Sequence, residues 1–89
     1  MIERQTEIVN RLGLHARAAA KLVHTAGNFQ SRITVVKDGE EVDAKSILGI
    51  LLLAAGQGSQ VTVRAEGQDE EDAVRAVTTL IANRFDEES

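Results

Sequence analysis

Residues 60–66 alternate strictly between apolar and polar side chains, which is the clearest structural pattern in the chain. The apolar set is Val61, Val63 and Ala65, and the polar set is Thr62, Arg64 and Glu66. Such alternation predicts a strand with one buried face, because successive side chains of a strand point to opposite sides. A strand of this kind needs partner strands beside it and a second layer over its apolar face. The rest of the sequence must supply both.

Three further segments carry strand patterns. Residues 2–9 alternate more loosely, and residues 31–36 are rich in the β-branched side chains that favour strands. Asp38-Gly39 follows, a pair typical of two-residue hairpins, so a short strand over residues 40–43 is expected to return antiparallel. In the first of these strands the residues expected to point outward are Glu3, Gln5 and Glu7.

Two helices are predicted between these strands. In residues 16–26 the apolar side chains at 19, 22, 23 and 26 form one helical face, and Gly27-Asn28 is a typical glycine ending. A second helix is expected to open at Ser46 and to close near Gly56. Residues 47–55 have no polar face, although a domain of this size can cover only one side of a helix. Some of these apolar side chains must therefore meet water, unless the neighbouring loop covers them.

A third helix is predicted after Asp69, which is expected to be its N-cap. Glu70, Glu71 and Asp72 fall in the first turn, where carboxylates interact favourably with the helix dipole. The dipole accounts for this acidic run, so we expect no metal site in it. The apolar positions that follow form one continuous helical stripe, at residues 73, 76, 77, 80 and 81.

The predicted order is strand, helix, strand, strand, helix, strand, helix. This order favours an α+β fold, in which an antiparallel sheet has the helices packed on one face. The 89 residues are expected to make one small domain over residues 1–89.

Composition narrows the possible functions. The chain has no cysteine, which excludes disulfides and cysteine-based metal sites and fits a reducing cytosol. The first residues lack the apolar run of a signal peptide, and no stretch approaches the roughly 20 apolar residues of a membrane span. A net charge of −4 and only two aromatic residues argue against nucleic-acid binding. We therefore expect a cytoplasmic protein without membrane insertion.

One segment places a histidine, His15, between a glycine-containing loop and the start of the alanine-rich helix. Amides at a helix start lack intrahelical acceptors and, with the dipole, readily bind an anion such as phosphate. The same positive end should keep the His15 ring neutral, with its lone pair available. Arg17 adds a planar fork of donors, so these features favour an imidazole that carries a phosphoryl group, with a capping or surface histidine as the alternative. His24, farther along the helix, is interpreted as a solvated polar-face residue.

Gly13-Leu14-His15-Ala16-Arg17 resembles the active-centre signature of the HPr family, the histidine phosphocarriers of the bacterial phosphoenolpyruvate-dependent sugar phosphotransferase system. Lys45-Ser46-Ile47-Leu48-Gly49-Ile50-Leu51 resembles the regulatory-serine motif of that family, at the family's separation. The resemblance implies an open-faced sandwich of four strands and three helices. The family usually has proline where this chain has Ala18, so a looser helix start with retained chemistry is expected.

The resemblance also implies roles for individual residues. His15 would accept a phosphoryl group on Nδ1 from phosphorylated enzyme I and pass it to A-type subunits of the sugar-permease enzyme II, while Arg17 and helix-start amides hold the phosphate oxygens. Ser46, besides capping its helix, would be a regulatory phosphorylation site for an HPr kinase/phosphorylase. The residues implied to contact partner proteins are Ile47, Leu48 and Leu51.

The expected protein is a monomeric carrier without a cofactor, rather than an enzyme, because no general base or metal ligand accompanies His15 in the sequence. One alternative is the nitrogen-related paralogue of HPr, which Asn10-Arg11-Leu12-Gly13 and the acidic tail Phe85-Asp86-Glu87-Glu88 resemble. Lys45-Ser46-Ile47-Leu48-Gly49 leans towards the sugar branch. An alternative from another class is a non-catalytic regulatory module that binds a small ligand or dimerises.

Overall fold

The computed structural model describes residues 1–88 and contains the predicted strands and helices in the predicted order, followed by a short 3-10 turn. The elements are β1 (Ile2–Glu7), α1 (Ala16–Ala26), β2 (Arg32–Lys37), β3 (Glu40–Asp43), α2 (Ile47–Leu52), β4 (Gln60–Glu66), α3 (Glu70–Ala82) and the 3-10 turn η1 (Arg84–Asp86). None of the helices in residues 1–88 combines the length and apolar character needed to cross a membrane.

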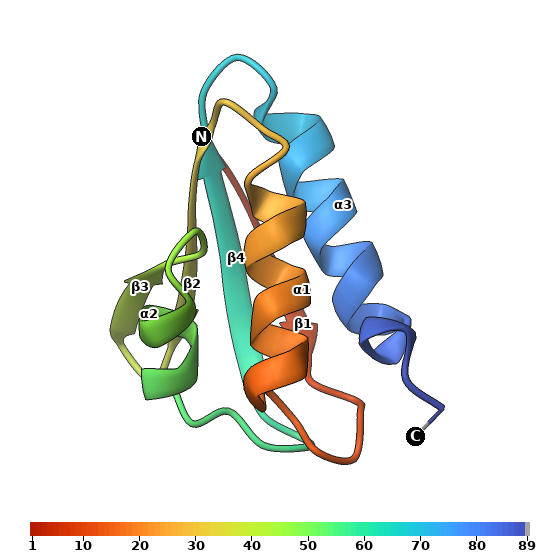
Figure 1. Cartoon of the computed structure of the whole chain (residues 1–89). Coiled ribbons are helices and arrows are strands. Elements are labelled where there is room, and N and C mark those ends of the chain that lie inside the picture. The colour runs from red at the N-terminus through yellow and green to blue at the C-terminus, as the bar shows by residue number, and fades with distance from the viewer. Residues whose placement is uncertain (89) are drawn as a thin grey trace.

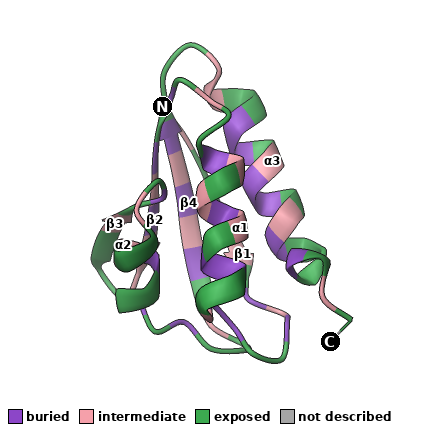
Figure 2. Cartoon of the chain, in the orientation of Figure 1, coloured by how far each residue is buried: buried purple, intermediate pink, exposed green. Residues whose placement is uncertain are grey.

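The four strands form one antiparallel sheet in the order β1-β4-β2-β3. β4 lies between β1 and β2, and its alternation is as predicted, because Val61, Val63 and Ala65 are buried. α1 and α3 lie side by side over one face of the sheet (Figure 1), and their buried residues line their inner sides (Figure 2). The α+β open-faced sandwich expected from the sequence is confirmed.

The hairpin between β2 and β3 forms at Asp38-Gly39, as predicted. Both residues have positive φ, 51° and 82°, which is the conformation that a type I′ turn requires. The turn fixes the register, in which Lys37 pairs with Glu40 and Val35 pairs with Val42.

α2 is shorter than predicted. It ends at Leu52 rather than near Gly56, because Ala54 has a left-handed φ of 51° that cannot continue a right-handed helix. Because the helix ends at Leu52, the residues that follow it, Leu53 and Ala55, lie in the core. The prediction was wrong because apolar periodicity alone does not reveal where the backbone turns away.

The boundaries of two strands also differ from the predictions. β2 runs from Arg32 to Lys37 rather than over residues 31–36. β1 ends at Glu7 rather than at residue 9, although the Ile8 amide still donates to the Ser59 carbonyl at 2.9 Å. α1 ends before Gly27 as predicted, but Gly27 keeps a right-handed φ of −65°. The helix therefore lacks the left-handed glycine ending that the sequence suggested.

Asp69 precedes α3 as predicted, but its side chain does not cap that helix. Its carboxylate accepts hydrogen bonds from the amides of Gln30 and Ser31, each at 2.9 Å, and from the Ser31 hydroxyl at 2.5 Å. The Ser31 hydroxyl, followed by the Gln30 amide, lowers the pKa of Asp69 below its ordinary range. At the helix start, Glu70 instead accepts a hydrogen bond from the Gly67 amide at 3.0 Å. Asp69 thus ties α3 to the segment before β2.

The buried face of α3 is rotated slightly from the predicted stripe. Positions 73, 77 and 81 are buried as predicted, whereas positions 76 and 80 are only half-buried. Val74 and Thr78 are buried as well. The Thr78 hydroxyl donates to the Val74 carbonyl at 2.8 Å, and this bond satisfies its polar group inside the core.

Candidate functional site

The loop before α1 is docked on the segment that follows α2. Gly13 has a φ of 65°, and a Cβ at this position would lie 2.6 Å from the carbonyl oxygen of Ala55, so only glycine fits. The Leu14 amide donates to the same Ala55 carbonyl at 2.9 Å, and the Leu14 side chain is buried. These contacts fix the position from which α1 starts.

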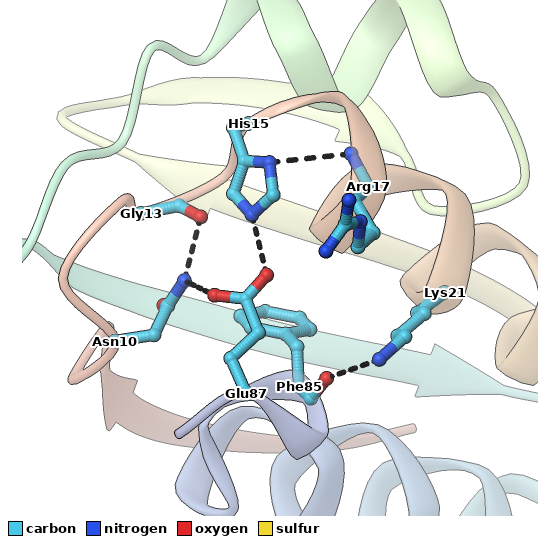
Figure 3. A network of polar contacts seen from close by, with 7 residues as sticks. All are labelled: Asn10, Gly13, His15, Arg17, Lys21, Phe85 and Glu87. Carbon is cyan, nitrogen blue, oxygen red and sulfur yellow. Dashed lines mark hydrogen bonds and ion pairs between the residues drawn. The ribbon is translucent and has the colours of Figure 1, made fainter. Parts of the chain in front are cut away.

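His15 is the N-cap of α1 and has an extended backbone conformation. Its Nδ1 accepts a hydrogen bond from the Arg17 amide at 3.3 Å, and its Nε2 lies 2.5 Å from Oε2 of Glu87 (Figure 3). An amide N–H can only donate, so Nδ1 carries the lone pair and Nε2 carries the proton that Glu87 accepts. The local structure thus distinguishes the two ring nitrogens, which sequence spacing does not.

The first turn of α1 is closed at Ala18, and the looser helix start that the resemblance implied is not seen. The Ala19 amide donates to the His15 carbonyl at 2.8 Å, and the Ala18 side chain is fully buried. His24 is exposed on the same helix, as expected for a polar-face residue. Position therefore separates the two histidines, since only His15 lies at a helix start.

Two cationic side chains project from α1, Arg17 in its first turn and Lys21 near its middle. Arg17 is exposed, and none of the ion pairs within residues 1–88 involves its guanidinium. Lys21 donates from Nζ to the carbonyl of Phe85 at 2.7 Å. An exposed guanidinium beside helix-start amides is an arrangement suited to holding phosphate oxygens.

Glu87 is the part of this site that the sequence did not predict. No pattern in the sequence paired it with His15, yet its carboxylate contacts the ring at Nε2. Asn10 donates from Nδ2 to Oε1 of Glu87 at 3.0 Å and to the Gly13 carbonyl at 2.9 Å. Burial acts to raise the pKa of Glu87, but the hydrogen bonds from Asn10 and His15 outweigh it and place that pKa below its ordinary range. The carboxylate is therefore ionised at neutral pH.

Phe85 explains how the end of the chain reaches His15. It follows α3 closely, is one of only two aromatic residues in the sequence, and is fully buried. An isolated aromatic residue just beyond the last helix is the one sequence signal that the tail folds back onto the domain. The acidic residues that follow give no such signal, since charges at a chain end are usually solvated.

The apolar side chains of α2 are divided between the core and the surface. Ile50 is fully buried, and Leu53 just after the helix is 3% exposed. The α2 surface consists of four exposed residues: Ile47 at 46%, Leu48 at 68%, Leu51 at 36% and Leu52 at 64%. The predicted exposure of the first three is confirmed, and the alternative that a loop covers them is wrong. Leu52 was not predicted as a contact residue.

Ser46 is the N-cap of α2, as predicted. Its Oγ accepts a hydrogen bond from the Gly49 amide at 3.1 Å, and the residue is half-buried. The preceding Lys45 donates from Nζ to the Phe29 carbonyl at 2.8 Å. Ser46 therefore lies at the edge of the α2 surface, immediately before Ile47.

Comparison with known proteins identifies the family. The family model described as "PTS HPr component phosphorylation site" matches residues 2–83. The phosphocarrier protein HPr of Cupriavidus necator is 55% identical over 87 residues, which cover 98% of each chain. The crystal structure of HPr from Thermoanaerobacter tengcongensis superposes with a TM-score of 0.96 at 50% identity and covers all of both chains.

Two further relatives are relevant to the branch of the family and to the oligomeric state. A phosphocarrier named NPr, from Shewanella violacea, is 44% identical and covers 99% of this chain and 97% of its own. The Thermoanaerobacter tengcongensis HPr has also been solved as a dimer, with a TM-score of 0.79 at 50% identity over 98% of this chain and 100% of that one. The 89-residue chain therefore belongs to the HPr family of the phosphotransferase system, whose members are phosphocarriers rather than enzymes.

Proposed function

We propose that this chain carries a phosphoryl group on Nδ1 of His15. The group comes from phosphorylated enzyme I and passes to A-type subunits of a sugar-permease enzyme II. The strongest support is the hydrogen bond from the Arg17 amide to Nδ1, which leaves the ring's lone pair at the positive end of α1. A nucleophile placed there meets a phosphate where amides and a guanidinium can hold its oxygens.

Arg17 is proposed to stabilise the group during transfer. In phosphoryl transfer, charge spreads over the three equatorial oxygens, and a planar guanidinium can contact two of them at once. The Arg17 side chain is exposed and has no ion pair within residues 1–88, so it need not break a contact to reach them. The expected contribution is electrostatic rather than structural.

The sugar branch is favoured over the nitrogen-related paralogue. The relative named HPr from Cupriavidus necator is 55% identical, compared with 44% for the NPr of Shewanella violacea. The segment around Ser46 also fits the sugar branch. A small-ligand regulatory module would give no role to the lone pair of His15 or to the guanidinium of Arg17.

The working form is proposed to be a cytoplasmic monomer. One chain supplies all the groups around His15, so a second copy is not needed to build the site. These groups are the backbone amide of Arg17, the side-chain amide of Asn10 and the Glu87 carboxylate. The dimeric form of the Thermoanaerobacter tengcongensis protein shows that a relative can associate. Sedimentation at micromolar concentration would distinguish the two forms.

The α2 surface is proposed to dock partner proteins, chiefly through Ile47, Leu48 and Leu51. Exposed apolar groups that gather in one patch mark interaction sites more often than isolated ones do. Ser46 is proposed as a regulatory phosphorylation site for an HPr kinase/phosphorylase. Phosphate at this N-cap would add nearly two negative charges where the helix dipole favours them, so the cost would fall on docking rather than on folding.

The test of the proposed function compares the two histidines. With phosphoenolpyruvate and enzyme I, the wild-type chain should gain one acid-labile phosphate. His15→Ala should abolish the labelling, and His24→Ala should leave it near the wild-type level. The label is followed by mass spectrometry of the intact chain before and after acid treatment. Retention of label in His15→Ala would refute the assignment of the acceptor.

A further inference from the structure

Residues 84–87, here called the C-terminal strap, fold back towards the start of α1. Arg84, Phe85 and Asp86 have positive φ values of 59°, 54° and 61°, and none of them is glycine. Such residues adopt the left-handed region only at an energetic cost, so other contacts must hold the turn in place.

Four contacts hold the strap. The Phe85 side chain is fully buried in the core, and its carbonyl accepts a hydrogen bond from Lys21 Nζ at 2.7 Å. The Glu87 carboxylate makes the remaining contacts (Figure 3). Its Oε1 accepts a hydrogen bond from the side-chain amide of Asn10, and its Oε2 accepts one from Nε2 of His15. The side chain of Glu87 is only 13% exposed. The strained turn thus delivers one ionised carboxylate to one nitrogen of the acceptor ring.

We propose that Glu87 is a positioning residue that keeps the proton of His15 on Nε2 and the lone pair on Nδ1. This inference rests on the proposed function, because it assigns the tautomer that phosphoryl acceptance requires. Each oxygen of Glu87 has one donor, and the Asn10 contact fixes the direction of the carboxylate. The Arg17 amide enforces the same tautomer from the other side of the ring.

The transfer step assigns a second role to the same contact. Nδ1 gives up its hydrogen bond from the Arg17 amide, and its lone pair forms the new bond to phosphorus. The donor's bond to phosphorus breaks, and its electron pair leaves with the donor. Nε2 keeps its proton, so the phosphorylated ring is positively charged. The Glu87 carboxylate then accepts a charge-assisted hydrogen bond from that ring, which is stronger than a bond from a neutral one. Onward transfer reverses each change, so Glu87 shifts the equilibrium towards the phosphorylated carrier.

The test compares Glu87→Gln with Glu88→Gln. Both variants remove one negative charge from the tail, and Glu88 is an exposed neighbour of Glu87. Nitrogen-15 chemical shifts of the His15 ring report which nitrogen bears the proton, without any phosphorylation. Wild type and Glu88→Gln should show the Nε2–H form alone, whereas Glu87→Gln should show a detectable share of the Nδ1–H form, since a glutamine amide can donate as well as accept.

The second measurement is the equilibrium constant for phosphoryl transfer from phosphorylated enzyme I. Loss of a hydrogen bond to a charged group should lower it roughly tenfold in Glu87→Gln and leave it unchanged in Glu88→Gln. Identical ring shifts in both variants would overturn the positioning role, and unchanged equilibria would overturn the effect on the phosphorylated state. If the wild-type chain accepts no phosphate, the proposed function fails, and the ring shifts alone decide the role of Glu87.

Discussion

The starts of α1 and α2 have the same local construction but different surroundings. Each has an N-cap residue in an extended conformation whose side chain accepts a backbone N–H, at 3.3 Å for His15 and 3.1 Å for Ser46. Beside His15 lies the Glu87 carboxylate, which comes from a distant part of the chain, whereas beside Ser46 lies the apolar α2 surface. Each helix start thus supplies a cap and a positive end, and the proposed roles in chemistry for one and recognition for the other follow from the groups that surround it.

The two helix starts also differ in how they are supported. α1 has 11 residues, and the C-terminal strap contacts it at two places, through Glu87 at His15 and through the Phe85 carbonyl at Lys21. α2 has six residues, and its cap contact joins residues only three positions apart. Removing support from the start of α1 should therefore cost much more stability than removing the cap of α2.

Phe85→Ala should produce the largest loss of stability. Truncating a fully buried phenylalanine typically costs about 3–5 kcal/mol, because transfer energy is lost and a cavity remains. The measurement is urea unfolding at pH 7. Phe29→Ala is the matched control, since Phe29 is only partly buried against the same core and should cost clearly less. Equal losses in the two variants would mean that the strap does not support the start of α1.

The two helix starts also show which features could be predicted from the sequence, namely those that depend on neighbouring residues. Both caps follow from local patterns, because a polar residue before an apolar helical run is a short-range signal. The hairpin turn at Asp38-Gly39 and the alternation in β4 are equally local. The turn and the bounds of β4 were predicted correctly, whereas β2 begins and ends one residue later than predicted.

Long-range contacts account for the features that were missed. Glu87 contacts His15, which lies 72 positions earlier in the sequence, and the turn that brings Glu87 there contains no glycine. Asp69 precedes α3 as a cap should, yet its carboxylate bonds Ser31, 38 positions away. No local pattern indicates that a side chain will prefer a distant partner to the helix beside it.

The second prediction separates the two roles proposed for Ser46. Ser46→Ala should destabilise the chain by about 1 kcal/mol, the usual cost of losing an N-cap side chain. Ser46→Asp and Ser46→Asn should both retain the cap, since aspartate and asparagine are favourable N-cap residues. Thermal unfolding of the three variants tests this order. A loss in Ser46→Asp as large as in Ser46→Ala would show that the site does not accommodate a charge.

Ser46→Asp and Ser46→Asn also form a matched pair for docking, because they differ mainly in charge. If phosphate at Ser46 costs ~3 kcal/mol of docking energy, binding would weaken by roughly 100-fold, and aspartate should reproduce part of this loss. The initial rate of His15 phosphorylation at sub-saturating chain concentration should therefore fall in Ser46→Asp and stay near wild type in Ser46→Asn. Equal rates in both variants would leave Ser46 as a helix cap only.

The third prediction concerns pH and the C-terminal strap. The pKa of Glu87 lies below its ordinary range in the folded chain, because the Asn10 and His15 bonds outweigh burial. Its carboxylate therefore stabilises the fold above the ordinary glutamate pKa of about 4.3, and the stabilisation is lost as pH falls through the folded value. The stability difference between wild type and Glu87→Gln should thus be present at pH 7 and shrink below about pH 4. A pH-independent difference would mean that packing, not charge, holds Glu87.

Leu48→Asp should change stability least. Leu48 is 68% exposed, so the new charge stays in water, and the free energy of unfolding should remain within about 0.5 kcal/mol of wild type. Ile50, in the same short helix, is the matched control. It is fully buried, and Ile50→Ala should cost about 2–5 kcal/mol. A loss in Leu48→Asp comparable to that in Ile50→Ala would mean that Leu48 belongs to the core.

The same variant should have its main effect on docking. A partner that covers the α2 surface must strip water from the new carboxylate, which costs free energy unless the partner supplies a matching cation. We expect roughly tenfold weaker binding to enzyme I, equivalent to ~1.4 kcal/mol. The measurement is the initial rate of His15 phosphorylation at sub-saturating chain, with the ring nitrogen shifts as a check that the start of α1 is intact. An unchanged rate would remove Leu48 from the docking surface, and any effect of charge at Ser46 would then need another cause.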